Sequence, residues 1–202
     1  ISAKLPVEDP VLWNGRKNPY LYTVRCEIFD STTQEVTDNI DIRTGLREYH
    51  IDSHKGFFLN GEHIKLQGVS RHQDRENMGN AITEKQHAED VKIILDVGAN
   101  SVRLAHYQQN SYFYDLCDES GLLVWAEVPV ISRFSPKRNE NAEQQLVELI
   151  KQNYNHPSIV VWGLSNEITM NGESDPDLLE NHRLLNLSLI HISEPTRPEP
   201  IS

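Results

Sequence analysis

The sequence has little that points to disulfides or membranes. Its two cysteines, Cys26 and Cys117, are far apart and fall in regions that we expect to be different domains, so reduced thiols are predicted. No apolar run approaches the ~20 residues that a membrane helix needs, and no charged and apolar leader opens the chain. Reduced thiols predict a cytoplasmic location, but Ile1 is not an initiator methionine and an upstream leader stays open.

Basic residues are also scarce. The 202 residues carry 19 Lys and Arg against 30 Asp and Glu, which gives a net charge of −11. Nucleic acids and anionic membranes are bound through clustered Lys and Arg, so this balance argues against both and favours a neutral ligand. The length suits one large or two small domains.

Residues 20 to 43 alternate between apolar and polar side chains with a period of two. Tyr22, Val24, Cys26 and Ile28 carry the alternation before a polar turn at residues 30–33, and it resumes afterwards. This pattern predicts antiparallel strands with one solvated face. Two or three strands do not make a stable sheet alone, so this segment is interpreted as the final part of a β-sandwich whose earlier strands precede Ile1.

Residues 50–182 alternate strands with helices. Asn60-Gly61 predicts a hairpin, and Thr83 with Gln86 predicts a capped helix that ends at Gly98. The further predictions are strands at 100–104 and 122–128 and from 159, and helices at 111–120 and 142–154. The fold class is therefore α/β, a partial (β/α)8 TIM barrel of about four strands. An open doubly wound sheet is the rival, but residues 68–72 do not form its glycine-rich phosphate turn.

Residues 183–202 differ in character from the rest. Nothing there is expected to continue the alternation of strands and helices, and residues 188–198 resemble translated vector or adapter sequence. We therefore interpret residues 183–202 as a tail foreign to the fold, with a proline-rich natural linker as the alternative.

Polar side chains follow each predicted barrel strand at its carboxyl end, where barrel enzymes keep their chemistry. In chain order they are Arg71, His72, Gln73 and Asp74, then Arg103 and His106, then Glu127, then Asn166 and Glu167. Taken singly, each histidine also fits a surface or core position, and Glu127 also fits a buried structural acid paired with Arg103. No spacing among them is diagnostic of a metal site.

Three segments, residues 68–74, 98–107 and 155–167, resemble the signatures of glycoside hydrolase family 2, and within it most closely the β-galactosidases. They occur in order and at suitable spacing, and the similarity covers about residues 5 to 182. The resemblance implies a jelly roll, an immunoglobulin-like sandwich and a TIM barrel, with residues 1–49 as the C-terminal part of that sandwich. It also implies a retaining glycosidase that acts on terminal β-galactosides.

Matched residue by residue, the resemblance implies a role for each rim residue. Glu167 matches the general acid/base, and Asn166 matches its neighbour that binds the 2-hydroxyl of the sugar. His72 and His106 match histidines of the substrate pocket. Arg103 matches the arginine that holds the nucleophile ionised, and Glu127 is expected to support it. Burial and a charged partner are expected to raise the pKa of Glu167.

The sequence departs from the family pattern in two places. No position matches the nucleophilic Glu, because Glu173, Glu180 and Glu194 are too close to Glu167 or lie in the tail, so this chain by itself is expected to be inactive. Ile131 and Arg133 stand where some relatives carry the Glu-x-His pair that binds magnesium, so no metal or cofactor is predicted.

Two alternatives stay open for the function. A β-glucuronidase shares the barrel and the Asn-Glu pair, but residues 68–72, Gly-Val-Ser-Arg-His, resemble the β-galactosidase motif more. A non-catalytic carbohydrate-binding fragment is the other alternative. In each case the expected partner is a small carbohydrate, with neither nucleic acid nor membrane involved, and a homo-oligomeric parent stays open.

Overall fold

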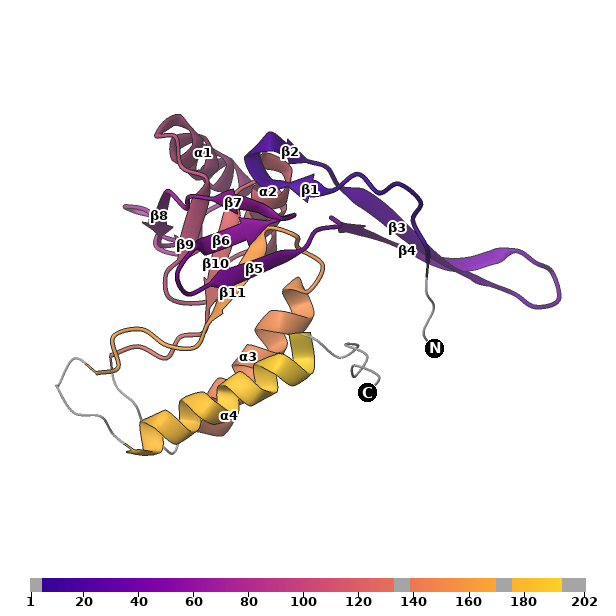
Figure 1. Cartoon of the computed structure of the whole chain (residues 1–202). Helices are drawn as coiled ribbons and strands as arrows, with labels where there is room; N and C mark the ends of the chain where they lie inside the picture. Colours follow the sequence, from indigo (N-terminus) through magenta and orange to yellow (C-terminus); the bar gives the residue numbers. More distant parts are fainter. Residues whose placement is uncertain (1–4, 133–138, 170–175, 194–202) are drawn as a thin grey trace.

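The computed structural model describes residues 5–132, 139–169 and 176–193. Its centre is a four-stranded parallel sheet with the strand order β11-β10-β9-β8 (Figure 1). The strands are β8 (Gly68–Arg71), β9 (Ser101–Leu104), β10 (Leu123–Glu127) and β11 (Ile159–Gly163). The connecting helices are α1 (Glu84–Asp96), α2 (Ser111–Ser120) and α3 (Asn139–Asn153). The predicted alternation of four strands and three helices is confirmed, and it forms a partial TIM barrel.

The helices begin and end where the sequence signals predict. Thr83 and Gln86 form a reciprocal capping box at the start of α1, which satisfies backbone N–H groups that have no partner within the helix. The side chain of Asn110 accepts a hydrogen bond of 2.9 Å from Tyr112 N at the start of α2. Gly98 and Gly121 follow α1 and α2 with φ of +79° and +72°, in the left-handed region that favours glycine.

The two faces of the parallel sheet are covered differently. Val102, Leu104, Val124 and Ala126 alternate onto the face under the helices, where they join Leu146 and its neighbours in the main core. The opposite face carries Leu123 and Val160, which pack against the small antiparallel sheet described next. Trp125, two residues after Leu123 in β10, lies on this same face and is 43% exposed.

A three-stranded antiparallel sheet covers the second face near the amino ends of the parallel strands. Its strands are β5 (Tyr49–Asp52), β6 (Gly56–Leu59) and β7 (Glu62–Ile64). Phe57 and Leu59 of β6 are buried and contribute to the second core cluster. Asn60 and Gly61 have φ of +50° and +79° between β6 and β7, so the predicted Asn-Gly hairpin is confirmed.

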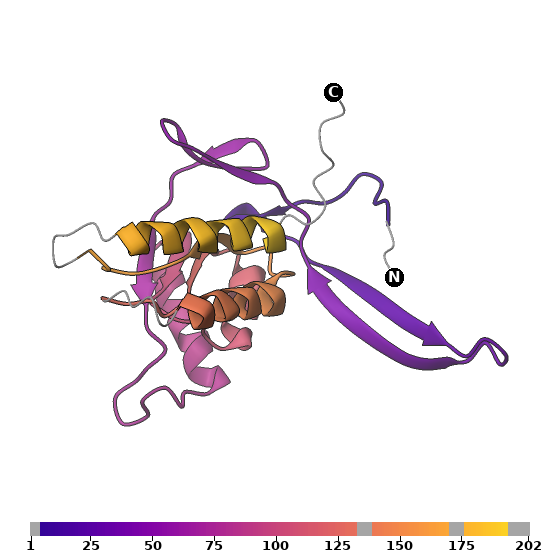
Figure 2. The same ribbon diagram turned by 90° about the horizontal axis from the view of Figure 1, so that it is seen from below.

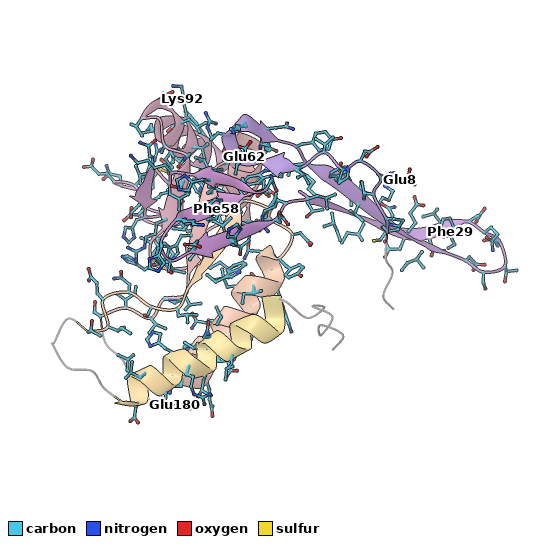
Figure 3. The ribbon with its side chains drawn as sticks, in the orientation of Figure 1. Glu8, Phe29, Phe58, Glu62, Lys92 and Glu180 are labelled. Atoms are coloured by element: carbon cyan, nitrogen blue, oxygen red, sulfur yellow. The ribbon has the colours of Figure 1, made fainter. Side chains whose placement is uncertain are left out.

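The amino-terminal region forms a long antiparallel ribbon that projects from the body (Figures 1 and 2). β3 (Tyr22–Phe29) pairs with β4 (Val36–Thr44), as the period-two pattern predicts. The predicted solvated face is present, and the opposite face of most of this ribbon is also exposed, because the two strands extend away from the body. Phe29, near the end of the ribbon (Figure 3), is 52% exposed. A shorter pair, β1 (Trp13–Asn14) and β2 (Asn18–Pro19), flanks the 3-10 helix η1 (Gly15–Lys17) and packs on α2.

The last described helix corrects one expectation from the sequence. α4 (Pro176–Ser193) lies alongside α3 (Figures 1 and 2). The expectation that nothing in residues 183–202 continues the alternation of strands and helices is therefore wrong for residues 183–193. Leu178, Asn181 and Leu185 recur at helical spacing and are buried, and Leu185 is 1% exposed within the main core. The polar Asn181 in the middle of this stripe hides the helical period from sequence reading. Residues 194–202 lie outside the described residues.

Membrane helices are absent from the part of the chain that the structure describes. None of its helices has the length and apolar character that crossing a bilayer requires.

The two helix-ending glycines allow a matched test of the packing. An added Cβ at Gly121 would overlap the backbone oxygen of Gly15, whereas at Gly98 it meets no described atom within 4 Å. Both positions have positive φ, so Gly98→Ala is expected to lower the free energy of unfolding by about 1 to 2 kcal/mol through backbone strain alone. Gly121→Ala adds a clash of about 1 to 3 kcal/mol. Urea unfolding of both variants measures the difference, and equal losses would contradict this contact between η1 and α2.

Candidate active site

The carboxyl ends of the four parallel strands meet at one edge of the sheet, and most of the polar residues predicted from the sequence lie at this rim. Arg103 is on β9, Glu127 ends β10, and Asn166 follows β11. His72 and His106 follow β8 and β9. The side chains of Arg103, His106, Glu127 and Asn166 are in direct contact, and the rings of His72 and His106 meet edge to face with centroids 5.2 Å apart.

Glu127 is the charged centre of this group. Its side chain is 0% exposed, and Arg103 donates to both carboxylate oxygens, from Nε to Oε1 at 2.5 Å and from Nη2 to Oε2 at 3.2 Å. The Nδ1 atom of His106 lies 2.9 Å from Glu127 Oε2. A carboxylate buried this completely needs a positive partner, because burial removes its hydration. These contacts match the second interpretation from the sequence, in which Glu127 is a buried acid paired with Arg103.

Arg103 also joins β9 to the end of β11. Its Nη2 donates to Asn166 Oδ1 at 2.7 Å. The backbone of Asn166 is held as well, since its N donates to Val130 O at 2.8 Å and its O accepts from Ser132 N at 2.9 Å. These bonds fix both the main chain and the amide of Asn166, directly before Glu167.

Glu167 differs from its expected environment. The side chain is exposed, so the expectation that this carboxyl group is buried is wrong for this structure. The reason is position, because β11 is an edge strand of the parallel sheet and Glu167 lies just beyond its carboxyl end. The backbone of Glu167 has φ of +55°, a left-handed conformation that L-residues other than Asn and Gly rarely adopt. Strain of this kind is typical of functional positions.

Tyr107 belongs to the rim, although sequence reasoning gave it no role. Its ring lies 5.9 Å from that of His72, and its hydroxyl accepts a hydrogen bond of 3.1 Å from Gln73 N. It therefore joins the loop after β8 to the loop after β9. Its position directly after His106 in the quoted motif was the signal that could have identified it.

Arg71 lies away from the rim, although the sequence places it among the polar residues that follow the first strand. It pairs in register with Leu104, so it faces the helices and is 7% exposed. Its guanidinium contacts Asp90 Oδ2 at 2.7 Å and lies 3.9 Å from the centroid of the Phe113 ring. Burial and the nearby Arg71 charge lower the pKa of His87, whose Nδ1 is 3.0 Å from Arg71 Nη2. This cluster holds α1 to the sheet.

One group of described side chains has a spacing that could hold a metal ion, namely Asp115, Asp118 and His156, with candidate ligand atoms within 4.8 Å of one another. It lies near the amino ends of the strands, away from the rim. His156 Nδ1 is 2.6 Å from Asp118 Oδ2, and Ser158 N donates to Asp118 Oδ1 at 3.1 Å. These bonds explain the cluster as an anchor between α2 and the start of β11.

Several carboxylates considered for the second catalytic role cannot be placed at the rim. Glu173 and Glu194 lie outside the described residues, as does Arg133 of the magnesium comparison. Glu180 is on the exposed side of α4, where it forms an ion pair of 2.6 Å with Arg183. Among the described residues that follow the barrel strands, Glu127 is a buried carboxylate, whereas Glu167 and Asp74 are exposed carboxylates.

Comparison with known proteins gives a consistent family. A profile described as "Glycosyl hydrolases family 2, TIM barrel domain" matches residues 51–197, and "Glycosyl hydrolases family 2" matches residues 1–47. A β-glucuronidase of Bacteroides fragilis is 43% identical over 98% of this chain and 29% of its own length. A β-galactosidase of Thermoanaerobacter pseudethanolicus is 34% identical over 81% of this chain and 22% of its own length.

A solved structure agrees with these sequence matches. The crystal structure of a putative β-galactosidase from Bacteroides fragilis superimposes with a TM-score of 0.86 and 44% identity, over 94% of this chain and 27% of that one. This chain thus spans less than a third of the relatives that it matches.

The left-handed backbone at Glu167 makes a testable difference to stability. Glu167→Gly removes the Cβ that makes positive φ unfavourable, so it is expected to raise the free energy of unfolding by up to about 1 kcal/mol. Glu167→Gln keeps the Cβ and is expected to leave stability within about 0.5 kcal/mol of the original. Urea unfolding of both variants measures these values. A stability loss in Glu167→Gly would show that the carboxyl group, and not the backbone, dominates at this position.

Proposed function

The chain belongs to glycoside hydrolase family 2, and from this premise we propose that it supplies the general acid/base of a retaining β-glycosidase. The proposed acid/base is Glu167. One observation carries the proposal: an exposed carboxylate follows the end of β11 on a strained backbone, next to an Asn166 whose amide is fixed by Arg103. Residues 1–49 are proposed as the end of the sandwich domain and residues 50–182 as barrel, and α4 continues beyond residue 182.

In the proposed mechanism Glu167 protonates the glycosidic oxygen as the bond to the leaving group breaks, and later removes a proton from the attacking water. A second carboxylate about 5 to 5.5 Å away attacks the anomeric carbon in such enzymes. By sequence no residue of this chain matches that nucleophile, so we assign to this chain the acid/base half of the mechanism. We also propose that the 202-residue chain by itself does not turn over substrate.

The remaining rim residues are proposed to bind the sugar. Asn166 is proposed to donate to the 2-hydroxyl, because its carbonyl oxygen is already occupied by Arg103. His72 and His106 are proposed to contact other hydroxyl groups, since their packed rings form one side of the rim. Arg103 and Glu127 support these groups from below through their buried ion pair. A carbohydrate-binding role without turnover would use the same contacts.

Two sugars are candidates, and each has a specific observation in its favour. The relative at 43% identity is named a β-glucuronidase, which favours a β-glucuronide. Residues 68–72 and the relative at 34% identity favour a β-galactoside. The solved structure at 44% identity that is named a putative β-galactosidase also favours the β-galactoside. We propose the β-glucuronide first, because the relative named a β-glucuronidase matches 98% of this chain and a second solved structure at 44% identity is named a β-glucuronidase.

Nitrophenyl glycosides decide between these sugars. The full-length protein that carries this sequence is expected to have a kcat/KM for nitrophenyl β-glucuronide at least about tenfold above that for nitrophenyl β-galactoside. A polar group placed to bind the sugar carboxylate discriminates by this factor or more. The 202-residue chain serves as the control without turnover. The reverse preference would assign the β-galactoside, and binding of sugar without hydrolysis of either would favour a non-catalytic carbohydrate-binding role.

The acid/base role of Glu167 is tested by the leaving group. With Glu167→Gln, kcat/KM for alkyl glycosides is expected to fall by about 10² to 10⁴, the usual contribution of general acid catalysis. For dinitrophenyl glycosides kcat/KM is expected to fall by less than about tenfold, because this leaving group departs without protonation. Glu180→Gln, at an exposed glutamate on α4, is the matched control. Equal losses for both substrates would remove Glu167 from this role.

A further inference from the structure

The contacts around Glu127 have fixed directions. A guanidinium carries only donors and a carboxylate carries only acceptors, whatever the positions of the hydrogen atoms. Arg103 Nη2 lies 2.7 Å from the side-chain oxygen position of Asn166, so the Asn166 atom facing Arg103 must be the carbonyl Oδ1. The amide NH₂ of Asn166 is therefore the end left for a ligand, and it offers two donors.

The same reasoning applies to His106. Its Nδ1 lies 2.9 Å from Glu127 Oε2, which only accepts, and 3.1 Å from Arg103 Nη2, which only donates. A single nitrogen of a neutral imidazole either donates to Glu127 or accepts from Arg103, but it does not do both. The Arg103 Nη2 group already has Glu127 and Asn166 as acceptors, whereas the buried Glu127 carboxylate gains a charge-assisted bond from an Nδ1–H. The favoured neutral tautomer therefore has its proton on Nδ1 and a free lone pair on Nε2.

We propose that Glu127 is a positioning residue that sets the tautomer of His106 directly and, by holding Arg103, the orientation of the Asn166 amide. His106 then presents an acceptor at Nε2, and Asn166 presents donors at Nδ2. A sugar hydroxyl is both a donor and an acceptor, so this pair matches adjacent hydroxyl groups. The proposal rests on the proposed glycosidase function for its ligand, but the hydrogen-bond directions follow from the described contacts alone.

Burial explains why one side chain can control two others. Glu127 is fully buried, and the side chains of Arg103 and His106 are only 32% and 20% exposed. Water therefore does not replace these bonds easily, and each group keeps the partner that satisfies it. The ring of Trp125, with its centroid 5.5 Å from the guanidinium carbon of Arg103, further limits the movement of Arg103.

Nitrogen-15 NMR of the histidine rings tests the tautomer in the full-length protein. In the unaltered protein His106 is expected to carry its proton on Nδ1, with assignment by loss of the signal in His106→Gln. In Glu127→Gln the oxygen of the new side-chain amide must face Arg103, because the guanidinium only donates. The NH₂ of the same amide then faces His106 Nδ1 and needs an acceptor there, so the ring proton is expected to move to Nε2. A proton on Nε2 in the unaltered protein would overturn the proposal, and this measurement does not depend on whether the variant folds.

A double-mutant cycle tests the effect on Asn166. If Glu127 acts through Asn166, the loss of kcat/KM caused by Glu127→Gln is expected to be at least about tenfold smaller in the Asn166→Ala background. Asp118→Asn is the matched control, because Asp118 is also a buried carboxylate that binds a histidine Nδ1, at the opposite end of the strands. Its effect is expected to be independent of Asn166.

The possible outcomes separate this proposal from the proposed function. Independent effects of Glu127→Gln and Asn166→Ala, like those of Asp118→Asn, would show that Glu127 has a structural role only and would overturn the control of Asn166. A full-length protein that cleaves neither glycoside would contradict the glycosidase function. In that case the ring tautomer in the unaltered protein and in Glu127→Gln still decides whether Glu127 sets the direction of these bonds.

Discussion

The candidate site depends on one buried ion pair, between Glu127 and Arg103. The carboxylate belongs to β10 and the guanidinium to β9, and the same guanidinium reaches Asn166 beyond β11. Three neighbouring strands are thus connected at their carboxyl ends by one charged group and its partners. Because Glu127 is fully buried, removing Arg103 would leave an uncompensated buried charge, which explains how polar side chains keep a defined geometry at this edge of the sheet.

The opposite end of the sheet is organised by hydrogen bonds from side chains to backbone carbonyl oxygens and by one anchored histidine. Trp13 is fully buried and donates from Nε1 to Asp118 O at 2.9 Å, while Arg47 donates to the carbonyl oxygens of Pro157 and Ile159, each at 2.7 Å. Burial lowers the pKa of Arg47. These bonds join the amino-terminal segments to α2 and to the start of β11. These structural contacts therefore lie at the amino ends of the strands and the candidate chemistry at their carboxyl ends, as in barrel enzymes generally.

Much of the fold could be predicted because its signals are local. The capping box at Thr83, the Asn60-Gly61 turn and the left-handed Gly121 each act within a few residues of sequence. α4 could not be predicted in this way, since its buried stripe includes Asn181 and is explained only by packing against α3. The exposure of the ribbon formed by β3 and β4 could not be predicted either. Alternation of apolar and polar residues predicts which face of a strand is apolar, but it does not predict which element covers that face.

The features of the candidate site also separate into those that follow from local sequence and those that depend on the tertiary structure. Sequence alone determined which polar residues follow the strands, since each strand ends where its apolar run ends, and the ends of parallel strands meet at one edge. Only the tertiary structure decided the direction in which each side chain points. Arg71 faces the helices because it is in register with Leu104, whereas Arg103 faces Glu127, and Glu167 is exposed because β11 lies at an edge. Register and strand order are long-range properties, and local sequence does not contain them.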